Sequence, residues 1–298
     1  MTRKVVTSDG RELSGAAPPV VDVVVVGSGG LPACPQPSPQ PQRTLDDTRG
    51  EVRILGRFVV PVRGGGVWIP GNSILRREAP KDDIDSARTY LKSIVGEDAD
   101  SDRIDTYLDR GPEALDFLIR HSALELEWVK GYSDYFPEAP GGRASGRSCE
   151  PRPFDARALG DDLATLHPPY MKVPLNMVVQ QSDYRWLSTG IRHWRGGPVR
   201  MLRVGMRSLA ARARKKKLIG LGPALMAELM LGVRDAGVTV ELGTRLVDLV
   251  TDSDRVVGVR LESGGSADHH ARSMRCHPRV WRVRQQRRHA RRVPATAE

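Results

Sequence analysis

The sequence feature that most constrains the fold is the run VVDVVVVGSGG at residues 20–30. A run this apolar and this rich in β-branched residues predicts a strand that is buried on both faces, as in a parallel sheet. The glycines at Gly27, Gly29 and Gly30 predict a tight turn whose backbone can approach a phosphate closely. The sequence therefore predicts the first strand and turn of a dinucleotide-binding α/β fold.

The residues that follow this turn do not continue the motif. A dinucleotide-binding turn should open a helix, but five of the eleven residues from Leu31 to Pro41 are proline. Each proline costs about 3 kcal/mol in a helix interior. The third glycine of the G-x-G-x-x-G motif is replaced by Pro32, and the acidic residue that would hold a ribose is unclear, with Glu51 near its place. On its own, the damaged motif is a weak signal for a cofactor.

Length and composition exclude several classes of protein. The chain has 298 residues, 39% of them hydrophobic, which is typical of a soluble globular protein. No apolar run approaches the roughly 20 residues of a membrane span, and the first residues lack the apolar core of a signal peptide. Cys34, Cys149 and Cys276 share no metal-ligand spacing. We therefore expect a reduced, cytoplasmic protein without a membrane span or a metal site.

The positive charge is concentrated near the carboxyl terminus. The formal net charge is +10, and the stretch Ala271–Arg292 is rich in arginine and contains no acidic residue. A basic arm that binds nucleic acid is one interpretation of this stretch, and a solvated tail is the other. The solvated tail is favoured, so nucleic acid is not the expected partner.

Periodicity predicts several elements between these ends. Asp82–Gly96 is predicted as a helix with an aspartate cap and a glycine stop. Two short helices are expected next, separated by Gly111-Pro112. Gly220–Gly237 has one apolar stripe at helical spacing, and Val238–Leu242 is predicted as a short buried strand. Two further strands are expected on either side of the Asp-Ser-Asp turn at residues 252–254.

Long blocks of the sequence resemble one family. They are GGGVWIPGN at 64–72, DRGPEALDFL at 109–118, the stretch Gly131–Gly160 and KVPLNMVV at 172–179. In this order and spacing they resemble the 3-ketosteroid-Δ1-dehydrogenases, FAD-dependent flavoproteins related to fumarate reductase. The resemblance extends over residues 21–30 and from 64 to about 265. It implies an α/β fold with an incomplete Rossmann-like FAD-binding domain and an inserted, partly helical substrate domain.

The resemblance also implies domain boundaries. Residues 1–19 would be an extension, 20–71 and 205–270 the two parts of the FAD-binding domain, 72–204 the substrate domain, and 271–298 a basic tail. Within this division, residues 31–63 and 271–298 do not match the family. Both segments can be read as family-like peptides in shifted reading frames, with more than one insertion or deletion. We therefore expect a truncated, frame-shifted member of the family.

The family's reaction defines the expected chemistry. A hydride leaves C1 of a 3-ketosteroid for the flavin, a proton leaves C2 to a tyrosinate base, and the C3 carbonyl is polarised. Tyr135 matches the family tyrosine that assists the base, and Tyr132 is a less suitable alternative. The base itself and the carbonyl-polarising residues have no counterpart here, so an inactive fragment is expected. The partners implied are a 3-ketosteroid and an electron acceptor.

The cofactor that the resemblance implies is FAD. The residues expected to contact it are Gly27, Ser28, Gly29 and Gly30 at the pyrophosphate, Gly64, Gly65 and Gly66 near the flavin, and Val247 near the adenine. Two alternatives stay open. One is an FAD-dependent oxidoreductase of the fumarate reductase type that acts on another substrate. The other is a basic protein that binds nucleic acid through Arg272–Arg292.

Overall fold

The structure is a computed structural model. It describes residues 20–21, 23–26, 52–56, 64–79, 83–96, 100–166, 177–183, 197–252, 255–263 and 270–276. The predicted glycine turn at Gly27, Ser28, Gly29 and Gly30 lies outside these residues, as does most of the basic tail. None of the described helices is long and apolar enough to cross a membrane.

A parallel sheet is formed by three segments that are far apart in the sequence. Strand β2 (Val23–Val26) pairs with β3 (Val52–Gly56), and β3 pairs with β9 (Thr239–Leu242). The predicted first strand forms and ends at Val26, directly before the predicted glycine turn. The prediction that it is buried on both faces is wrong for β2, because its first three residues are only half-buried and Val26 is 51% exposed. Strand β3 lies in a segment for which the sequence showed no period. The prediction that β9 is buried is wrong, because Thr239 is exposed and the rest of the strand is only half-buried.

A second sheet continues from the same first segment. Strand β1 (Val20–Val21) pairs in parallel with β12 (His270–Cys276). Strand β12 pairs antiparallel with β11 (Arg255–Ser263), which pairs with β10 (Thr244–Asp252). The hairpin predicted around residues 252–254 is therefore confirmed. Its inner face is apolar, with a cluster of buried Val21, Val259 and Leu261.

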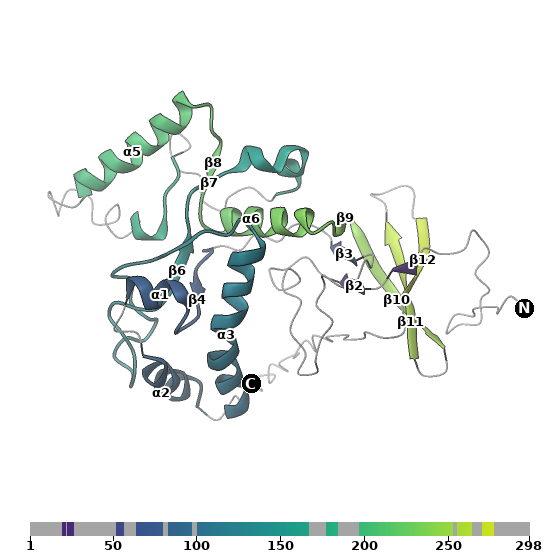
Figure 1. Cartoon of the computed structure of the whole chain (residues 1–298), viewed down its shortest axis with the longest axis horizontal. Coiled ribbons are helices and arrows are strands. Elements are labelled where there is room, and N and C mark those ends of the chain that lie inside the picture. The colour runs from purple at the N-terminus through teal and green to yellow at the C-terminus, as the bar shows by residue number, and fades with distance from the viewer. Residues whose placement is uncertain are drawn as a thin grey trace, which may run out of the picture.

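The helical part of the molecule surrounds a small antiparallel sheet (Figure 1). Its strands are β4 (Val67–Trp68), β6 (Ser148–Pro151) and β5 (Leu126–Trp128), in that order. The helices are α1 (Ser73–Glu78), α2 (Ile84–Val95), α3 (Ser101–His121) and α6 (Leu221–Asp235). The core shared by α1, α3, α6 and the sheet is made of buried Ile74, Leu75, Ala79, Leu115, Leu124, Leu126, Cys149 and Leu229. Helix α2 packs on α3 in a separate cluster of buried Ala87, Ile104 and Leu108.

Helix α3 is one helix and not the predicted pair of short helices. Pro112 lies inside it, although proline removes a hydrogen bond from the helix ladder. The buried face of α3 continues through this point, because Ile104, Leu108, Gly111 and Leu115 are all buried. Gly111 leaves room for Ile69, whose Cγ2 atom would lie 3.0 Å from a Cβ at this position. Tertiary packing along this face outweighs the local breaking signal.

The two helices predicted with glycine stops are confirmed. Helix α2 begins after Asp83, whose carboxylate accepts the Asp85 and Ser86 N–H groups, and it ends at Gly96 with φ of 60°. Helix α6 ends before Gly237, which has φ of 71°. In Figure 1, α6 runs from the helical part toward β9, so its sequence connects the two halves of the molecule.

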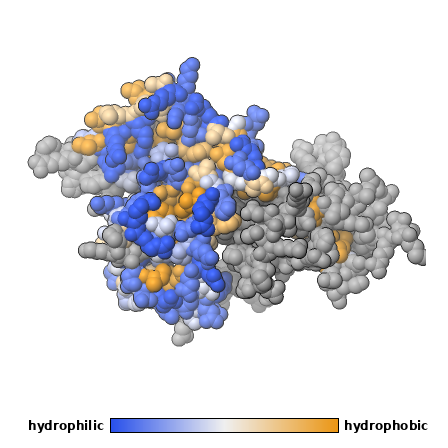
Figure 2. Space-filling view, viewed as in Figure 1, coloured by the Kyte–Doolittle hydropathy of each residue, from blue (hydrophilic) through white to orange (hydrophobic). Residues whose placement is uncertain are grey.

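Helix α5 (Gly197–Ala213) has an unusual distribution of side chains. Its inner face is tied to the body by Arg200 and Arg207, whose guanidinium groups contact buried Asp183 at 3.2 and 2.8 Å. Its outer face is apolar, and it appears as the orange band at the upper left of Figure 2. The exposed side chains there are Val199, Met201, Leu202, Met206 and Leu209. The remaining elements are η3 (Ala156–Thr165) and the pair β7 (Phe154–Asp155) and β8 (Leu218–Ile219).

Candidate functional site

The glycine run Gly64–Gly66, here called the glycine cradle, leads directly into β4. Gly65 is buried and has φ of +64°, in the left-handed region that favours glycine. A Cβ atom on Gly65 would lie 2.4 Å from the Leu221 carbonyl carbon and 2.5 Å from the Gly222 nitrogen. The cradle therefore rests against the first turn of α6. Its cap, Gly220, supplies no side-chain hydrogen bond to that turn.

An unpaired acceptor lies beside the cradle. The Gln181 Oε1 atom is buried and has no hydrogen-bond partner among the residues that the structure describes. A Cβ built on Gly66 would lie 3.4 Å from this oxygen. A buried amide oxygen without a partner is costly, so this atom is suited to a donor that a ligand brings.

Glu150 holds the turn that carries Gln181. Its carboxylate oxygens accept the Gln181 N–H at 2.6 Å and the Ser182 N–H at 3.0 Å. Glu150 is fully buried, and this burial raises the pKa of its carboxyl group above the ordinary value, although the two N–H donors oppose the shift. The backbone of Gln181 is thus held in place by the buried Glu150 side chain of β6.

These residues fit an FAD molecule. Close approach of a flat ring to the backbone needs glycine, and the exposed Gly66 provides it, whereas the missing side chain of Gly65 leaves room for α6. The Gln181 oxygen can accept an N–H from the ring edge. The cradle is consequently a candidate cofactor site made from three separate parts of the chain.

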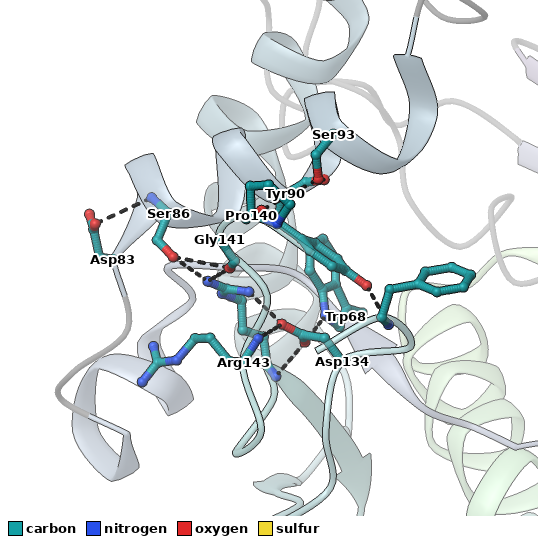
Figure 3. A network of polar contacts seen from close by, with 11 residues as sticks. Trp68, Asp83, Ser86, Tyr90, Ser93, Asp134, Pro140, Gly141 and Arg143 are labelled. Carbon is teal, nitrogen blue, oxygen red and sulfur yellow. Dashed lines mark hydrogen bonds and ion pairs between the residues drawn. The ribbon is translucent and has the colours of Figure 1, made fainter. Parts of the chain in front are cut away.

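The loop between β5 and β6 carries the candidate catalytic tyrosine. Tyr135 is 86% exposed, and Phe136 beside it is 53% exposed. Asp134, immediately before them, is buried, and its carboxylate accepts the Trp68 indole N–H at 2.8 Å (Figure 3). Because Trp68 lies two residues beyond Gly66, strand β4 joins this loop to the glycine cradle.

The structure brings some of the predicted site residues together and separates another. Gly64, Gly65 and Gly66 form the cradle, and Tyr135 lies on the loop that β4 holds. Val247 lies in β10 at a register shift between Leu246 and Asp248, in the antiparallel sheet and not beside the cradle. It is 47% exposed, and the expected contact with adenine stays a prediction.

Sequence analysis missed four residues of this site. Trp68 and Glu150 lie in blocks that resemble the family, but neither they nor Gln181 were given a role, because their roles depend on contacts between distant segments. Asp134 stands in the quoted stretch beside Tyr135, but it was given no role. Asp134 stands between aromatic residues in its loop, and this pattern could have indicated a buried carboxylate that holds the loop through hydrogen bonds.

Substitution of Gly65 by alanine should destabilise the protein, because the new Cβ meets backbone atoms of α6 and not a flexible side chain. We expect a loss of about 1–3 kcal/mol in the free energy of unfolding. Urea denaturation followed by circular dichroism measures it. Gly64→Ala is the matched control, because Gly64 is exposed and the nearest atom to its Cβ position is 4.0 Å away. Equal effects of the two substitutions would contradict the prediction.

Comparison with known proteins places this geometry in context. The sequence profile of the family described as "FAD binding domain" matches residues 22–280. The chain is 53% identical over 205 residues to a 3-oxosteroid 1-dehydrogenase of Mycolicibacterium smegmatis, covering 69% of this chain and 36% of that protein. A 3-oxosteroid 1-dehydrogenase of Mycobacterium tuberculosis is 52% identical with the same coverage. The chain thus spans about a third of the length of these curated relatives.

A solved structure has a similar fold. The 3-ketosteroid Δ1-dehydrogenase from Sterolibacterium denitrificans, in complex with 1,4-androstadiene-3,17-dione, matches with a TM-score of 0.70 and 26% identity. The match covers 86% of this chain and 46% of that one. A 3-ketosteroid-Δ4-(5α)-dehydrogenase from Rhodococcus jostii matches with a TM-score of 0.51 and 16% identity, over 92% of this chain and 47% of that one, which concerns the fold alone.

Proposed function

We propose, on the premise that this chain belongs to the FAD-binding-domain family of flavoproteins, that it forms the cofactor-binding portion of an enzyme that dehydrogenates 3-ketosteroids between C1 and C2. The cofactor of this family is FAD. One observation carries the proposal. The glycine cradle and the loop of Tyr135 are joined by β4, through the Trp68 N–H that binds Asp134 at 2.8 Å.

Each part of the site has a distinct task in this proposal. FAD, when bound, accepts the hydride that leaves C1. Gly66 allows the ring to approach the backbone, Gly65 lets the cradle pack against α6, and Gln181 accepts a hydrogen bond from the ring. The base that takes the C2 proton has no counterpart in this chain. The Tyr135 hydroxyl would donate a hydrogen bond to that tyrosinate base, which stabilises its ionised form, lowers its pKa and orients it. An electron acceptor is the second partner that this reaction requires.

The proposed architecture has two parts. Residues 20–71 and 205–270 would form a Rossmann-like FAD-binding domain, and residues 72–204 an inserted substrate domain. The parallel order β2-β3-β9, with the run Gly27–Gly30 directly after β2 in the sequence, supports the first part. The frame-shifted origin of residues 31–63 and 271–298 stays a prediction. Strands β3 and β12 nevertheless form within or beside these segments, β3 as a member of the parallel sheet and β12 as a member of the other.

The proposal predicts that a 3-ketosteroid binds close to Tyr135. With 3-fluorotyrosine placed at position 135 and FAD in excess, androst-4-ene-3,17-dione should shift the fluorine NMR resonance, because a steroid ring changes the local environment of an exposed phenol. The steroid without the C3 ketone, 5α-androstan-17-one, is the matched ligand control and should shift it less. FAD binding without any steroid-dependent shift would favour a flavoprotein that acts on another substrate class.

A further inference from the structure

We propose that four side chains, three of them buried and one half-buried, position the backbone of Tyr135, so that its phenol is presented at a fixed place while remaining exposed. These are Trp68, Tyr90, Asp134 and Arg147, here called the Asp134 clamp. The inference rests on the proposed function, because it is there that Tyr135 has a catalytic task. The clamp residues touch neither substrate nor cofactor, so they are positioning residues.

On the amino-terminal side of Tyr135, the carboxylate of Asp134 accepts four hydrogen bonds. Its Oδ1 atom accepts from Trp68 Nε1 at 2.8 Å and from the Arg147 backbone nitrogen at 3.2 Å. Its Oδ2 atom accepts from Arg147 Nη1 at 2.6 Å and from the Arg143 backbone nitrogen at 3.1 Å. The Asp134 N–H in turn donates to the Arg143 carbonyl at 3.0 Å. The residue before Tyr135 therefore has almost no freedom to move (Figure 3).

Arg147 connects this carboxylate to helix α2. Its Nη2 atom donates to Ser86 Oγ at 3.0 Å and to the Gly141 carbonyl at 3.1 Å. Its guanidinium carbon also lies 6.0 Å from the ring centre of Trp68. The side chains of Arg147 and Asp134 are both fully buried. The pair thus fastens the loop to a rigid helix from within.

On the carboxyl-terminal side of Tyr135, a different residue of α2 holds the chain. The Phe136 N–H donates to the Tyr90 hydroxyl at 3.1 Å. Tyr90 is itself only 3% exposed, and its ring centre lies 5.8 Å from that of Trp68. The backbone of Tyr135 is therefore anchored on both sides, by residues whose side chains contact one another.

The burial pattern supports a positioning role for the clamp. Removing two charges from water is costly, and a well-packed apolar pair is often as stable as a buried ion pair. The hydrogen bonds of a buried ion pair are directional, so they fix the orientation of the loop in a way that apolar contacts do not. Tyr135 is 86% exposed although the residue before it is buried, so these contacts do not serve to pack the Tyr135 side chain into the core. A side chain on a fixed backbone has only its two torsions left to order when it binds.

Tyr90→Phe tests the inference with the loss of a single hydroxyl. In the full chain, amide exchange at Phe136 should become about ten-fold faster, because its acceptor is removed. Exchange at Leu115, in the core of α3, should stay unchanged and reports on global stability. The resonance of 3-fluorotyrosine at position 135 should also broaden or split as the residue samples more positions. Tyr132→Phe, which removes a hydroxyl from the same loop, is the matched control and should alter neither readout.

Asp134→Asn is the second variant, because it keeps the size of the side chain and removes its charge. If it folds, its fluorine resonance should change further than that of Tyr90→Phe. An unchanged resonance and unchanged Phe136 exchange in the folded Tyr90→Phe variant would overturn the inference. These readouts need no steroid. A wild-type resonance that responds to the clamp variants but not to a 3-ketosteroid would therefore leave the clamp standing and reject the proposed function.

Discussion

Replacement of Arg147 by methionine should lower the free energy of unfolding by about 3–5 kcal/mol, the largest loss that we expect from a single substitution in this chain. Methionine fills much of the same volume, but it leaves the Asp134 carboxylate buried with an uncompensated charge. It also removes the donors to Ser86 and to the Gly141 carbonyl. Chemical denaturation at pH 7, followed by tryptophan fluorescence and circular dichroism, measures the loss.

A second ion pair provides the matched control. Arg157 Nη2 lies 2.6 Å from Asp155 Oδ2, the same separation as in the buried pair, but the Arg157 side chain is 49% exposed. Arg157→Met should therefore cost much less, because water replaces the lost partner. The double variant Arg147→Met with Asp134→Asn should recover part of the loss, since no charge is left buried. Equal losses for the exposed and the buried pair would contradict the prediction.

Glu228→Gln should make the protein more stable at pH 8, with an effect that disappears near pH 4.5. Glu228 lies in α6, is 2% exposed, and its Oε2 atom has no hydrogen-bond partner among the described residues. Burial, together with the nearby charge of Glu125, raises the pKa of its carboxyl group from 4.5 to about 8, against the opposing effect of the Glu125 N–H. Glutamine keeps the shape without the titrating proton.

The direction of this pH dependence follows from proton binding. Because the folded pKa is above the unfolded one, the folded protein holds a proton that the unfolded chain releases between pH 4.5 and 8. The contribution of this bound proton to the free energy of unfolding is complete below pH 4.5. It is lost as the pH rises to about 8, at about 1.4 kcal/mol for each pH unit. The expected gain of Glu228→Gln at pH 8 is roughly 3–5 kcal/mol.

Denaturation curves at pH 5, 6.5 and 8 for wild type and Glu228→Gln would measure this difference. The control is Met230→Gln, which places the same side chain on the same helix without removing an ionisable group. Its free energy of unfolding should follow the wild-type dependence on pH. Parallel pH profiles for wild type and Glu228→Gln would show that Glu228 ionises in the folded protein as it does in the unfolded chain.

Several elements were predicted because their information is local. The stripe and the glycine stop of α6 gave its bounds, and the Asp-Ser-Asp turn located the β10–β11 hairpin. Asp83 and Gly96 did the same for α2. In each case the period of apolar residues and the capping residue agree, so neighbouring residues alone specify the element.

Other elements could not be predicted from neighbours. Strand β3 has no recognisable period around it, and it becomes a strand because β2 and β9 pair with it on both sides. Helix α3 continues through Pro112, because its buried face packs without interruption. In both cases tertiary contacts outweigh a local preference of at most a few kcal/mol.

The sequence by itself determined the first strand and the helix–hairpin unit from α6 to β11, and it predicts Tyr135 and the Gly64–Gly66 run as site residues. Only the tertiary structure decided that β4 joins the loop of that tyrosine to the glycine cradle, that Gln181 lies beside the cradle, and that the residues of the Asp134 clamp contact one another. The reason is physical. Capping and periodicity act over a few neighbouring residues, whereas a buried carboxylate is satisfied by donors from segments up to 66 positions away, which no local pattern encodes.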